Sequence, residues 1–313
     1  MIPPWKIVFF GTPSFALPTL KDLLEGPDDV IAVVTQPDRR KGRGQRVSPS
    51  PVKELALQHG VPVFQPEIVK EGSFLEEIRK THPDLFVVVA YGQILPQSLL
   101  TIPKRGAVNV HASLLPKYRG AAPIAWAILK GEGVTGVTTM MMDEGMDTGA
   151  ILLQAKVPVG ERETGESLHD RLALLGSQLL RETVERLKAA TIDPRPQDHS
   201  QATYAPSIRK EEGSVDWKMD AGEIDRKVRA LNPWPGAFTR WGGKFLKIYK
   251  GEVREGSAKG QAGTVVWVGA DFIEVETGRG SFLVEEIQME GKKRMGVRDF
   301  LAGHPIPVGT TFE

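Results

Sequence analysis

Short apolar segments alternate with amphipathic segments along the first part of the chain. The apolar segments predict strands, because they are brief and rich in β-branched and aromatic residues. They lie at residues 6–10, 30–35, 84–92, 107–113 and 135–143. Helices are predicted between them, at residues 13–26, 51–60 and 121–131. Strand and helix in regular alternation indicate an α/β fold with a doubly wound, mostly parallel sheet.

The pattern changes after a longer helical segment. Leucines recur at helical spacing over residues 164–188, at Leu168, Leu172, Leu175 and Leu179. Residues 190–206 carry prolines and no apolar periodicity, so we expect a linker there. The rest of the chain contains short strands separated by glycines, which is typical of a small OB-like β-barrel. The predicted organisation is a first domain at 1–189, a linker at 190–206 and a β-barrel domain at 207–313.

Composition narrows the class of protein further. The 313 residues are 41% hydrophobic and 25% charged, as in an ordinary globular protein. The formal net charge is +1, so a site for a polyanion has to be a local cluster. The absence of cysteine excludes disulfides, thiolate metal ligands and a cysteine nucleophile. Because no secretory signal pattern and no membrane-spanning apolar segment are visible, we expect a cytoplasmic protein.

The turn after the first predicted strand has the position of a nucleotide site but not its residues. Gly11 lies between strand and helix, where a dinucleotide-binding protein carries three glycines in the pattern G-x-G-x-x-G. A single glycine permits a tight turn but does not support the close approach of a pyrophosphate. The P-loop pattern is missing as well. A nucleotide-dependent dehydrogenase is therefore not indicated.

Asn109 and His111 are the strongest candidates for chemistry. They are two positions apart in the predicted strand at 107–113, so both side chains leave the same face. Ligands of open parallel sheets bind beyond the carboxyl ends of the strands, where this pair is expected to lie. Asp147 follows in a glycine-punctuated loop and is expected to reach the imidazole. An Asp beside a His orients the ring and stabilises imidazolium, while an Asn supplies a neutral donor to an oxyanion.

Residue types alone leave other interpretations of this group open. A buried Asn–His pair at a strand end also serves to satisfy backbone groups. One histidine and two separated carboxylates make a poor zinc site, which disfavours metal binding. No suitable serine or cysteine nucleophile accompanies the three residues, so direct acyl transfer to an amine is favoured over a covalent acyl-enzyme.

Several motifs together resemble a known family. The segments NVHASLLPKYRGAAP, GMDTG, IVFFGTPSFALPTL and VVVAYGQILP are similar to those of the 10-formyltetrahydrofolate-dependent formyltransferases. QPDRRKGRGQRVSPSPVK and RALNPWPGA narrow the resemblance to the methionyl-tRNA formyltransferases, and it runs along essentially the whole chain. It implies a Rossmann-like formyltransferase domain followed by a tRNA-binding β-barrel. It also implies formyl transfer from 10-formyltetrahydrofolate to the α-amino group of methionyl initiator tRNA, without a metal.

The resemblance also implies roles for individual residues. Asn109, His111 and Asp147 would be the catalytic group: Asn109 and protonated His111 stabilise the oxyanion, and Asp147 orients His111. The folate site would be lined by Ser113, Leu114, Leu115 and Pro116, opposite a wall formed by residues 91–95. Ala112 stands where the family usually has glycine. Its methyl group would narrow the turn beside His111 if the backbone there needed a positive φ.

A basic cluster follows the second predicted strand. It consists of Arg39, Arg40, Lys41, Arg43 and Arg46, with glycines at positions 42 and 44. Such a cluster is often only a solvated loop, but mobile arginines and lysines also suit contacts with phosphates. The resemblance implies that this loop binds the acceptor stem of tRNA, with Arg43 the first candidate.

The identity of the acceptor has alternatives. A formyltransferase for an amino-sugar nucleotide would share the Asn–His–Asp group but need no basic cluster. A formyl-folate hydrolase would use water as the acceptor. An RNA-binding protein with an inert enzyme-like half would have no activity, and the β-barrel would have no nucleic-acid role if it only packed on the first domain. We expect a monomer.

Overall fold

The computed structural model describes residues 3–41, 46–256 and 260–313. The chain divides into two compact units. Unit 1 comprises Met1–Pro123, Val134–Pro158 and His169–Ala205, and unit 2 comprises Ile124–Gly133, Val159–Leu168 and Pro206–Glu313. Two short internal segments therefore belong to unit 2, and the segment after residue 189 belongs to unit 1 as far as Ala205.

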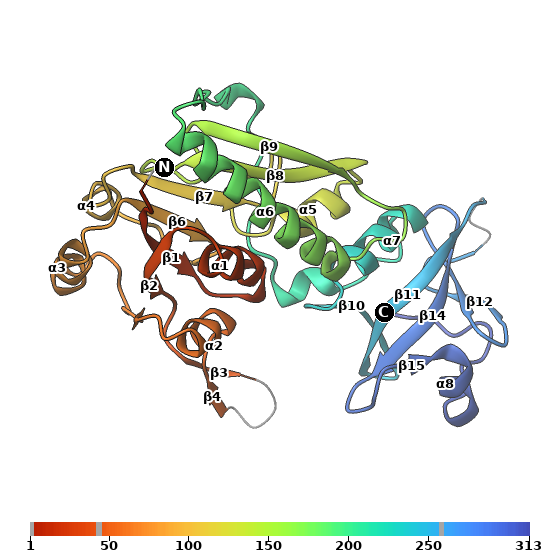
Figure 1. The fold of residues 1–313 in the computed structure, drawn as a ribbon. Helices are drawn as coiled ribbons and strands as arrows, with labels where there is room; N and C mark the ends of the chain where they lie inside the picture. Colours follow the sequence, from red (N-terminus) through yellow and green to blue (C-terminus); the bar gives the residue numbers. More distant parts are fainter. Residues whose placement is uncertain (1–2, 42–45, 257–259) are drawn as a thin grey trace. The chain divides into compact units, whose positions relative to one another are not determined.

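Unit 1 is built on a seven-stranded sheet of order β5-β2-β1-β6-β7-β8-β9 (Figure 1). The strands are β1 (Lys6–Gly11), β2 (Asp29–Val34), β5 (Val63–Phe64), β6 (Leu85–Val89), β7 (Ala107–His111), β8 (Val134–Met141) and β9 (Ile151–Pro158). The first five in spatial order are parallel, whereas β8 runs antiparallel to β7 and β9 antiparallel to β8. The predicted α/β fold with a mostly parallel sheet is confirmed.

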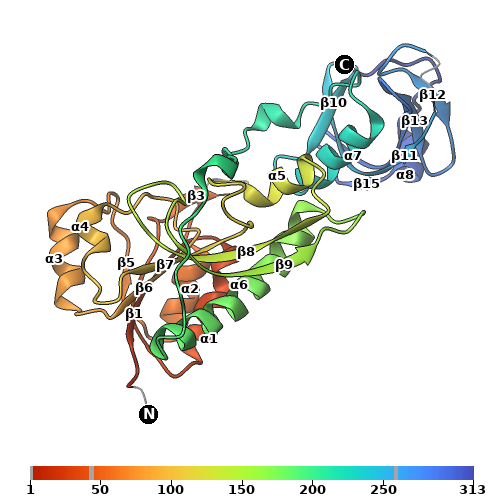
Figure 2. The same ribbon diagram turned by 90° about the horizontal axis from the view of Figure 1, so that it is seen from above.

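Helices cover both faces of this sheet (Figure 2). They are α1 (Leu17–Leu24), α2 (Pro51–Gln58), α3 (Gly72–Lys80), α4 (Gln97–Leu100) and α6 (Gly165–Lys188), with a 3-10 turn at Ser14–Ala16. On one face, Phe10 of β1 packs in a core with Phe74 of α3 and Leu99 of α4. On the other face, α6 approaches Val110 of β7 so closely that a Cβ on Gly176 would lie 2.9 Å from it.

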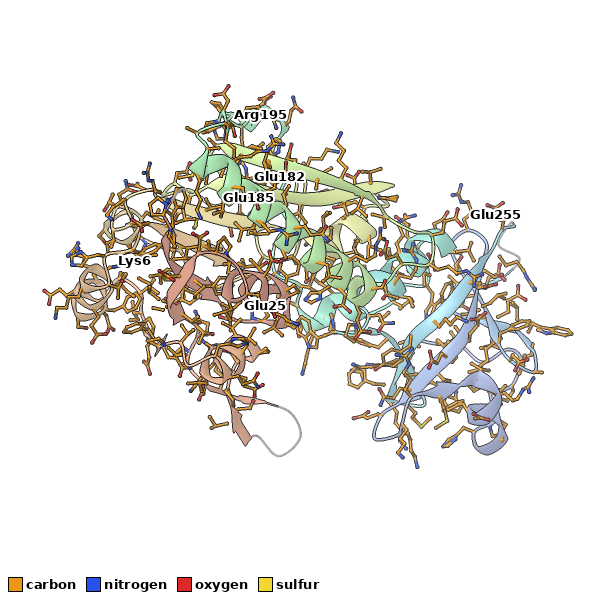
Figure 3. The ribbon with its side chains drawn as sticks, viewed as in Figure 1. Lys6, Glu25, Glu182, Glu185, Arg195 and Glu255 are labelled. Carbon is orange, nitrogen blue, oxygen red and sulfur yellow. The ribbon has the colours of Figure 1, made fainter. Side chains whose placement is uncertain are left out.

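The outer face of α6 is charged. Glu182 and Glu185 are exposed there (Figure 3), whereas Leu172 and Leu179 are buried. The helix predicted from leucine spacing over residues 164–188 is present, and the spacing places Leu172 and Leu179 on its buried side.

A small hairpin lies outside the main sheet. Its strands β3 (Arg39–Lys41) and β4 (Arg46–Ser48) pair antiparallel, with Arg40 opposite Val47. The ends of the predicted basic loop thus have regular backbone structure. Arg43, the first candidate for tRNA contact, lies outside the described residues.

Unit 2 contains an antiparallel sheet of order β10-β11-β14-β13-β12, with β15 paired to β14. Its elements are α5 (Pro123–Leu129), α7 (Ala221–Ala230), β10 (Ala237–Trp241), β11 (Lys244–Arg254), β12 (Val265–Val268), β13 (Ile273–Glu276), β14 (Ser281–Met289), β15 (Met295–Gly296) and α8 (Val297–Gly303). Trp217, Ile248 and Phe282 are buried in its core. A second, small β domain was predicted, and its antiparallel sheet confirms that prediction.

Short 3-10 turns occupy the connecting segments, at His199–Gln201 and Lys210–Gly213. Among all helices within the described residues, none combines the length and the apolar character needed to cross a lipid bilayer.

Candidate active site

Strand β7 brings Asn109 and His111 together. Both side chains leave the face opposite Val110, which packs against α6, as strand alternation requires. Asn109 is 9% exposed and His111 is 6% exposed, so neither is a surface residue. The neighbouring strand β8 pairs with β7 at both positions, with Met140 opposite Asn109 and Thr138 opposite His111. The backbone that carries the pair is therefore held rigidly inside the sheet.

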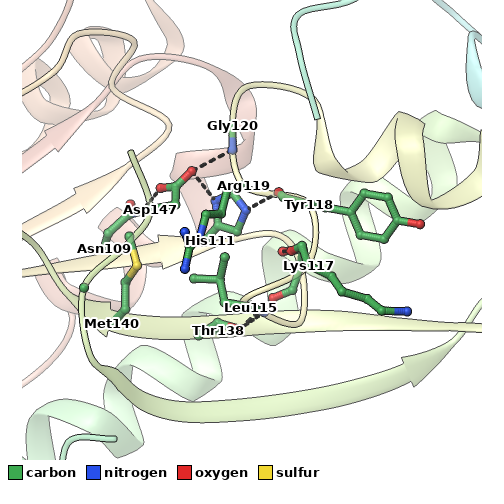
Figure 4. A network of polar contacts seen from close by, with 12 residues as sticks. Asn109, His111, Leu115, Lys117, Tyr118, Arg119, Gly120, Thr138, Met140 and Asp147 are labelled. Carbon is green, nitrogen blue, oxygen red and sulfur yellow. Dashed lines mark hydrogen bonds and ion pairs between the residues drawn. The ribbon is translucent and has the colours of Figure 1, made fainter. Parts of the chain in front are cut away.

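Asp147 completes the group from the loop between β8 and β9 (Figure 4). Its Oδ2 lies 3.6 Å from His111 Nδ1, and its Oδ1 accepts a hydrogen bond from Asn109 Nδ2 at 3.4 Å. The backbone N–H of Gly120 donates to Oδ2 at 2.8 Å. The structure thus brings together the three residues that the sequence singled out, with Asp147 between the other two.

The ring of His111 is oriented by its other nitrogen. Nε2 lies 2.9 Å from the backbone carbonyl oxygen of Tyr118. A carbonyl can only accept a hydrogen bond, so Nε2 carries a proton and donates it. Nδ1 therefore faces Asp147 as a lone pair in the neutral ring and as an N–H in imidazolium.

The loop after β7 is tied to β8 and β9. Thr138 Oγ1 donates to the carbonyl oxygen of Ser113 at 2.7 Å and accepts from the N–H of Leu115 at 3.1 Å. Gln154 Nε2 donates to the carbonyl oxygen of Leu115 at 2.9 Å. These bonds satisfy backbone groups that a loop would otherwise leave unpaired. The segment after β7 therefore has a defined conformation.

The predicted folate residues differ in what they expose. Ser113 and Leu115 are buried, and Leu115 packs with Met140 and Ile151. Leu114 and Pro116 are half-buried. The outward surface of this segment is therefore formed by backbone and by the side chains at 114 and 116.

Ala112 does not occupy a left-handed conformation, so its methyl group meets no backbone strain. The positive φ angles in this region lie elsewhere, at Tyr118 (60°), Gly120 (117°) and Asp147 (54°). Of these three, only Gly120 is a glycine, the residue type that adopts a positive φ without strain. A Cβ there would lie 2.8 Å from the carbonyl oxygen of Ala205, which accounts for the glycine.

The predicted opposing wall at residues 91–95 contains both buried and exposed residues. Tyr91 is 2% exposed and packs edge-on against Phe10, and burial raises the pKa of its phenol. Leu95 is buried in the same core, whereas Ile94 is 75% exposed. Thr12, a residue that we did not single out from the sequence, donates from Oγ1 to the carbonyl oxygen of Tyr91 at 3.0 Å.

A cavity of about 330 Å³ opens where β1, β2 and β6 end. Its lining includes Thr12, Gln36, Arg39, Ser50, Ala90 and Gly92. It thus joins the start of the predicted wall to Arg39, the first residue of the basic cluster. Asn109, His111 and Asp147 do not line it. Thr12 after β1, Ser48 at the end of β4 and Ser50 after it were the available signal for this cavity, and serine and threonine are too common in turns to be selective.

Two polar residues beside Asp147, Gln197 and Arg119, were not predicted from the sequence. Gln197 Nε2 donates to the carbonyl oxygen of Asp147 at 2.9 Å, and its Oε1 accepts from Arg119. Both side chains are buried. Gln197 lies in the segment that was predicted to be a linker, so its position along the chain gave no reason to connect it with the site.

No cluster of metal-ligating side chains occurs within the part of the chain that the structure describes. The three site residues include only one histidine and one carboxylate. The arrangement is suited to stabilising a developing oxyanion and moving a proton.

Comparison with known proteins gives this geometry its context. A family model described as "Formyl transferase" matches residues 5–184, and "Formyl transferase, C-terminal domain" matches residues 207–305. The chain is 52% identical to the methionyl-tRNA formyltransferase of Trichlorobacter lovleyi over 306 residues, which is 98% of this chain and 96% of that protein. The chain belongs to the methionyl-tRNA formyltransferase family. Another member, from Caldanaerobacter subterraneus subsp. tengcongensis, is 52% identical over 97% of this chain and 99% of that protein.

Solved structures share the fold of this formyltransferase at lower identity. An N-formyltransferase from Helicobacter canadensis, in complex with folinic acid and dTDP-3-aminofucose, is 20% identical with a TM-score of 0.68, covering 91% of this chain and all of that one. HypX from Aquifex aeolicus, in complex with tetrahydrofolic acid, is 20% identical with a TM-score of 0.63, covering 95% of this chain and 47% of that one. At this identity the likeness concerns the fold.

Proposed function

We propose that this protein transfers the formyl group of 10-formyltetrahydrofolate to the free α-amino group of methionyl initiator tRNA, giving N-formylmethionyl-tRNA. The observation that carries the proposal is the 52% identity with methionyl-tRNA formyltransferases over both domains. The convergence of Asn109, His111 and Asp147 at one point of the sheet supports the chemistry.

Asn109 and His111 stabilise the oxyanion in this reaction. Asn109 Nδ2 has two N–H groups, and only one is directed at Asp147. His111 Nδ1 lies 3.6 Å from Asp147 Oδ2, a longer contact than the 3.4 Å between Asn109 Nδ2 and Asp147 Oδ1. Asn109 Nδ2 therefore has a donor available to the oxygen that becomes negative when the amine attacks the formyl carbon, and His111 Nδ1 has one when the ring is imidazolium.

Asp147 orients the ring of His111. As the new carbon–nitrogen bond forms, the formyl C=O electrons move to oxygen; they return when the bond to N10 of the folate breaks. The attacking amine loses one proton and N10 gains one, so the step balances without an oxidant or reductant. His111 and Asp147 lie where they assist this transfer, directly or through water.

The folate is placed against the segment of Ser113, Leu114, Leu115 and Pro116, opposite residues 91–95. A flat pteridine ring suits this segment, because the half-buried side chains of Leu114 and Pro116 give it apolar contact. The exposed side chain of Ile94 supplies apolar contact.

The tRNA is held by its phosphates. Arg39, Arg40, Lys41, Arg43 and Arg46 contact the acceptor stem, and residues 207–313 contact the backbone elsewhere through exposed lysines such as Lys244, Lys292 and Lys293. These contacts position the substrate, and they distinguish this acceptor from a small amine.

An acceptor assay tests the proposal. The protein is incubated with 10-formyltetrahydrofolate and one of four additions: methionylated initiator tRNA, methionylated elongator tRNA, an amino-sugar nucleotide, or none. We expect N-formylmethionine to appear on the initiator tRNA. Formylation of the sugar nucleotide alone would overturn the acceptor assignment, and folate turnover without any acceptor would replace transfer by hydrolysis.

A further inference from the structure

Gln197 uses all of its hydrogen-bonding groups beside the site. Its Nε2 donates to the carbonyl oxygens of Asp147 (2.9 Å) and Gly149 (2.8 Å). Its Oε1 accepts from Arg119 Nε (3.1 Å) and Nη2 (2.6 Å). Because carbonyls only accept and guanidinium only donates, the amide has one possible orientation. The side chain is 5% exposed, so these bonds do not compete with bulk water.

The loop that Gln197 holds needs external support. The backbone of Asp147 has a φ of 54°, a left-handed conformation that costs free energy for residues other than glycine. Gly149 lies so close to β8 that a Cβ would be 1.7 Å from the carbonyl oxygen of Met141. The backbone N–H of Gly120 holds the carboxylate of Asp147, whereas the side chain of Gln197 holds its backbone carbonyl. The backbone on both sides of residue 148 is thereby clamped by one amide.

The segment that carries Gln197 is itself anchored. Arg195 exchanges backbone hydrogen bonds with Ile151, the first residue of β9, at 2.8 and 2.9 Å. Two residues further along the chain, the side chain of Gln197 contacts the loop that contains Asp147 and Gly149. Arg119 is 2% exposed, and its Nη2 lies 3.2 Å from His199 Nδ1. The segment that carries Gln197 therefore contacts the guanidinium through a second residue.

We propose that Gln197 is a positioning residue for formyl transfer, with Arg119 as the group that fixes its orientation. It acts through Asp147: by holding the carbonyl of residue 147 it fixes where the carboxylate meets His111 and Asn109. This inference rests on the proposed function only in taking Asp147 as a member of the catalytic group. Displacement of a catalytic carboxylate by about 1 Å is enough to lower turnover on the order of 100-fold.

Gln197→Glu removes the hydrogen bonds to the carbonyls of Asp147 and Gly149 while keeping an acceptor for Arg119. Glutamate keeps an acceptor for Arg119 but replaces the two N–H donors by an oxygen that repels the carbonyls of Asp147 and Gly149. We expect kcat for formylation to fall about 10- to 100-fold, with little change in the KM of either substrate. Gln201→Glu is the matched control, since this residue of the same segment is exposed and its side chain bonds to Asp198. Its kcat should stay near that of the wild type.

A double-mutant cycle with Asp147→Asn separates positioning from general structure. If Gln197 acts through the Asp147 carboxylate, Gln197→Glu should lower kcat much less in the Asp147→Asn background than in the wild type. An equal reduction of kcat in both backgrounds, or a wild-type kcat in Gln197→Glu, would overturn the proposal.

Amide hydrogen exchange gives an answer that does not depend on the acceptor. Peptides covering residues 143–149 should exchange faster in Gln197→Glu than in the wild type and in Gln201→Glu. Unchanged exchange there would also overturn the clamp. If the wild type fails to formylate methionyl-tRNA while this exchange difference appears, the proposed function is wrong and the positioning role stands.

Discussion

Asn109 shows at the scale of a single residue how little freedom the site has. Its side chain is almost buried in β7, and its amide is already directed by Asp147 Oδ1 at 3.4 Å. A donor that is oriented before the substrate arrives stabilises a developing oxyanion without reorganisation. Removing this donor should therefore affect the chemical step more than substrate binding.

Asn109→Ala should lower kcat by about 100-fold or more, because one oxyanion donor is removed. The KM values should change much less, since the donor acts mainly when charge develops. Steady-state formylation kinetics measure both quantities, and thermal unfolding shows whether the variant is folded. A folded variant that kept kcat within a few-fold of the wild type would show that Asn109 is not an oxyanion donor.

Asp84 makes a pH-dependent contribution to stability. The hydrogen bond from the Lys104 ammonium, followed by that from the Lys6 backbone N–H, lowers the pKa of Asp84 in the folded protein. A lowered folded-state pKa stabilises the fold above the unfolded-state value of about 3.9, and this contribution disappears as the pH falls through the folded value. Asp84→Asn should reduce the free energy of unfolding at pH 7.

The difference in free energy of unfolding between the wild type and Asp84→Asn should shrink below about pH 4, where the Asp84 carboxyl of the wild type becomes protonated. Urea unfolding of both proteins at pH 7 and near pH 3 measures this. A deficit that stayed constant with pH would indicate that packing, rather than the charge, is responsible.

At the scale of elements, β8 lets the loop after β7 lie close to the sheet because it contains a glycine. A Cβ on Gly136 would lie 2.1 Å from the carbonyl oxygen of Ala155 in β9 and 2.6 Å from Leu114 Cδ2. Any side chain at 136 must therefore move a strand or displace Leu114. The pairing of β8 with β9 and the proposed folate surface therefore both require that residue 136 has no side chain.

Gly136→Ala should lower the stability by about 1–3 kcal/mol through overpacking and raise the KM for 10-formyltetrahydrofolate. Gly133→Ala is the control, because no atom lies within 4 Å of a Cβ built there. Thermal unfolding and folate titrations compare the two variants. If Gly136→Ala were destabilised but kept a normal KM for 10-formyltetrahydrofolate, Leu114 would not be part of the folate-binding surface.

The elements of the site differed in how far the sequence predicted them. Asn109 and His111 were predictable because a strand repeats every two residues, and Asp147 because glycines marked its loop. The left-handed backbone at Tyr118 and Asp147 was not, since both residue types occur mainly at negative φ. Gln197 was not either: it is separated from Asp147 by 50 positions, and no local period relates the two.

At the scale of the whole molecule, local patterns predicted the two kinds of sheet. They did not indicate that Ile124–Gly133 and Val159–Leu168 belong to the second unit, because that membership arises from contacts between distant parts of the chain. The near-neutral net charge also means that tRNA affinity depends on local clusters.

Salt dependence should reveal those clusters. For every phosphate that the protein no longer neutralises, the slope of log K against log salt concentration should become shallower by about 0.7–0.9. Arg43→Ala, alone and then with Arg39, Arg40, Lys41 and Arg46 replaced, should lower this slope stepwise in tRNA-binding measurements across salt concentrations. A slope unaffected by all five replacements would place the phosphate contacts elsewhere, with Lys292 and Lys293 as the next substitutions.

The segment after α6 has a consequence for how the enzyme is made. The backbone N–H of Ala122 donates to the carbonyl of Ala205 at 3.1 Å, and that of Tyr118 donates to Thr203 Oγ1 at 2.8 Å. The family match for the first domain ends at residue 184, before these partners are reached. A nascent chain on the ribosome thus lacks the last hydrogen bonds of the site until Ala205, well beyond that point, has been synthesised. An expressed fragment of the catalytic half has to extend through Ala205 to retain them.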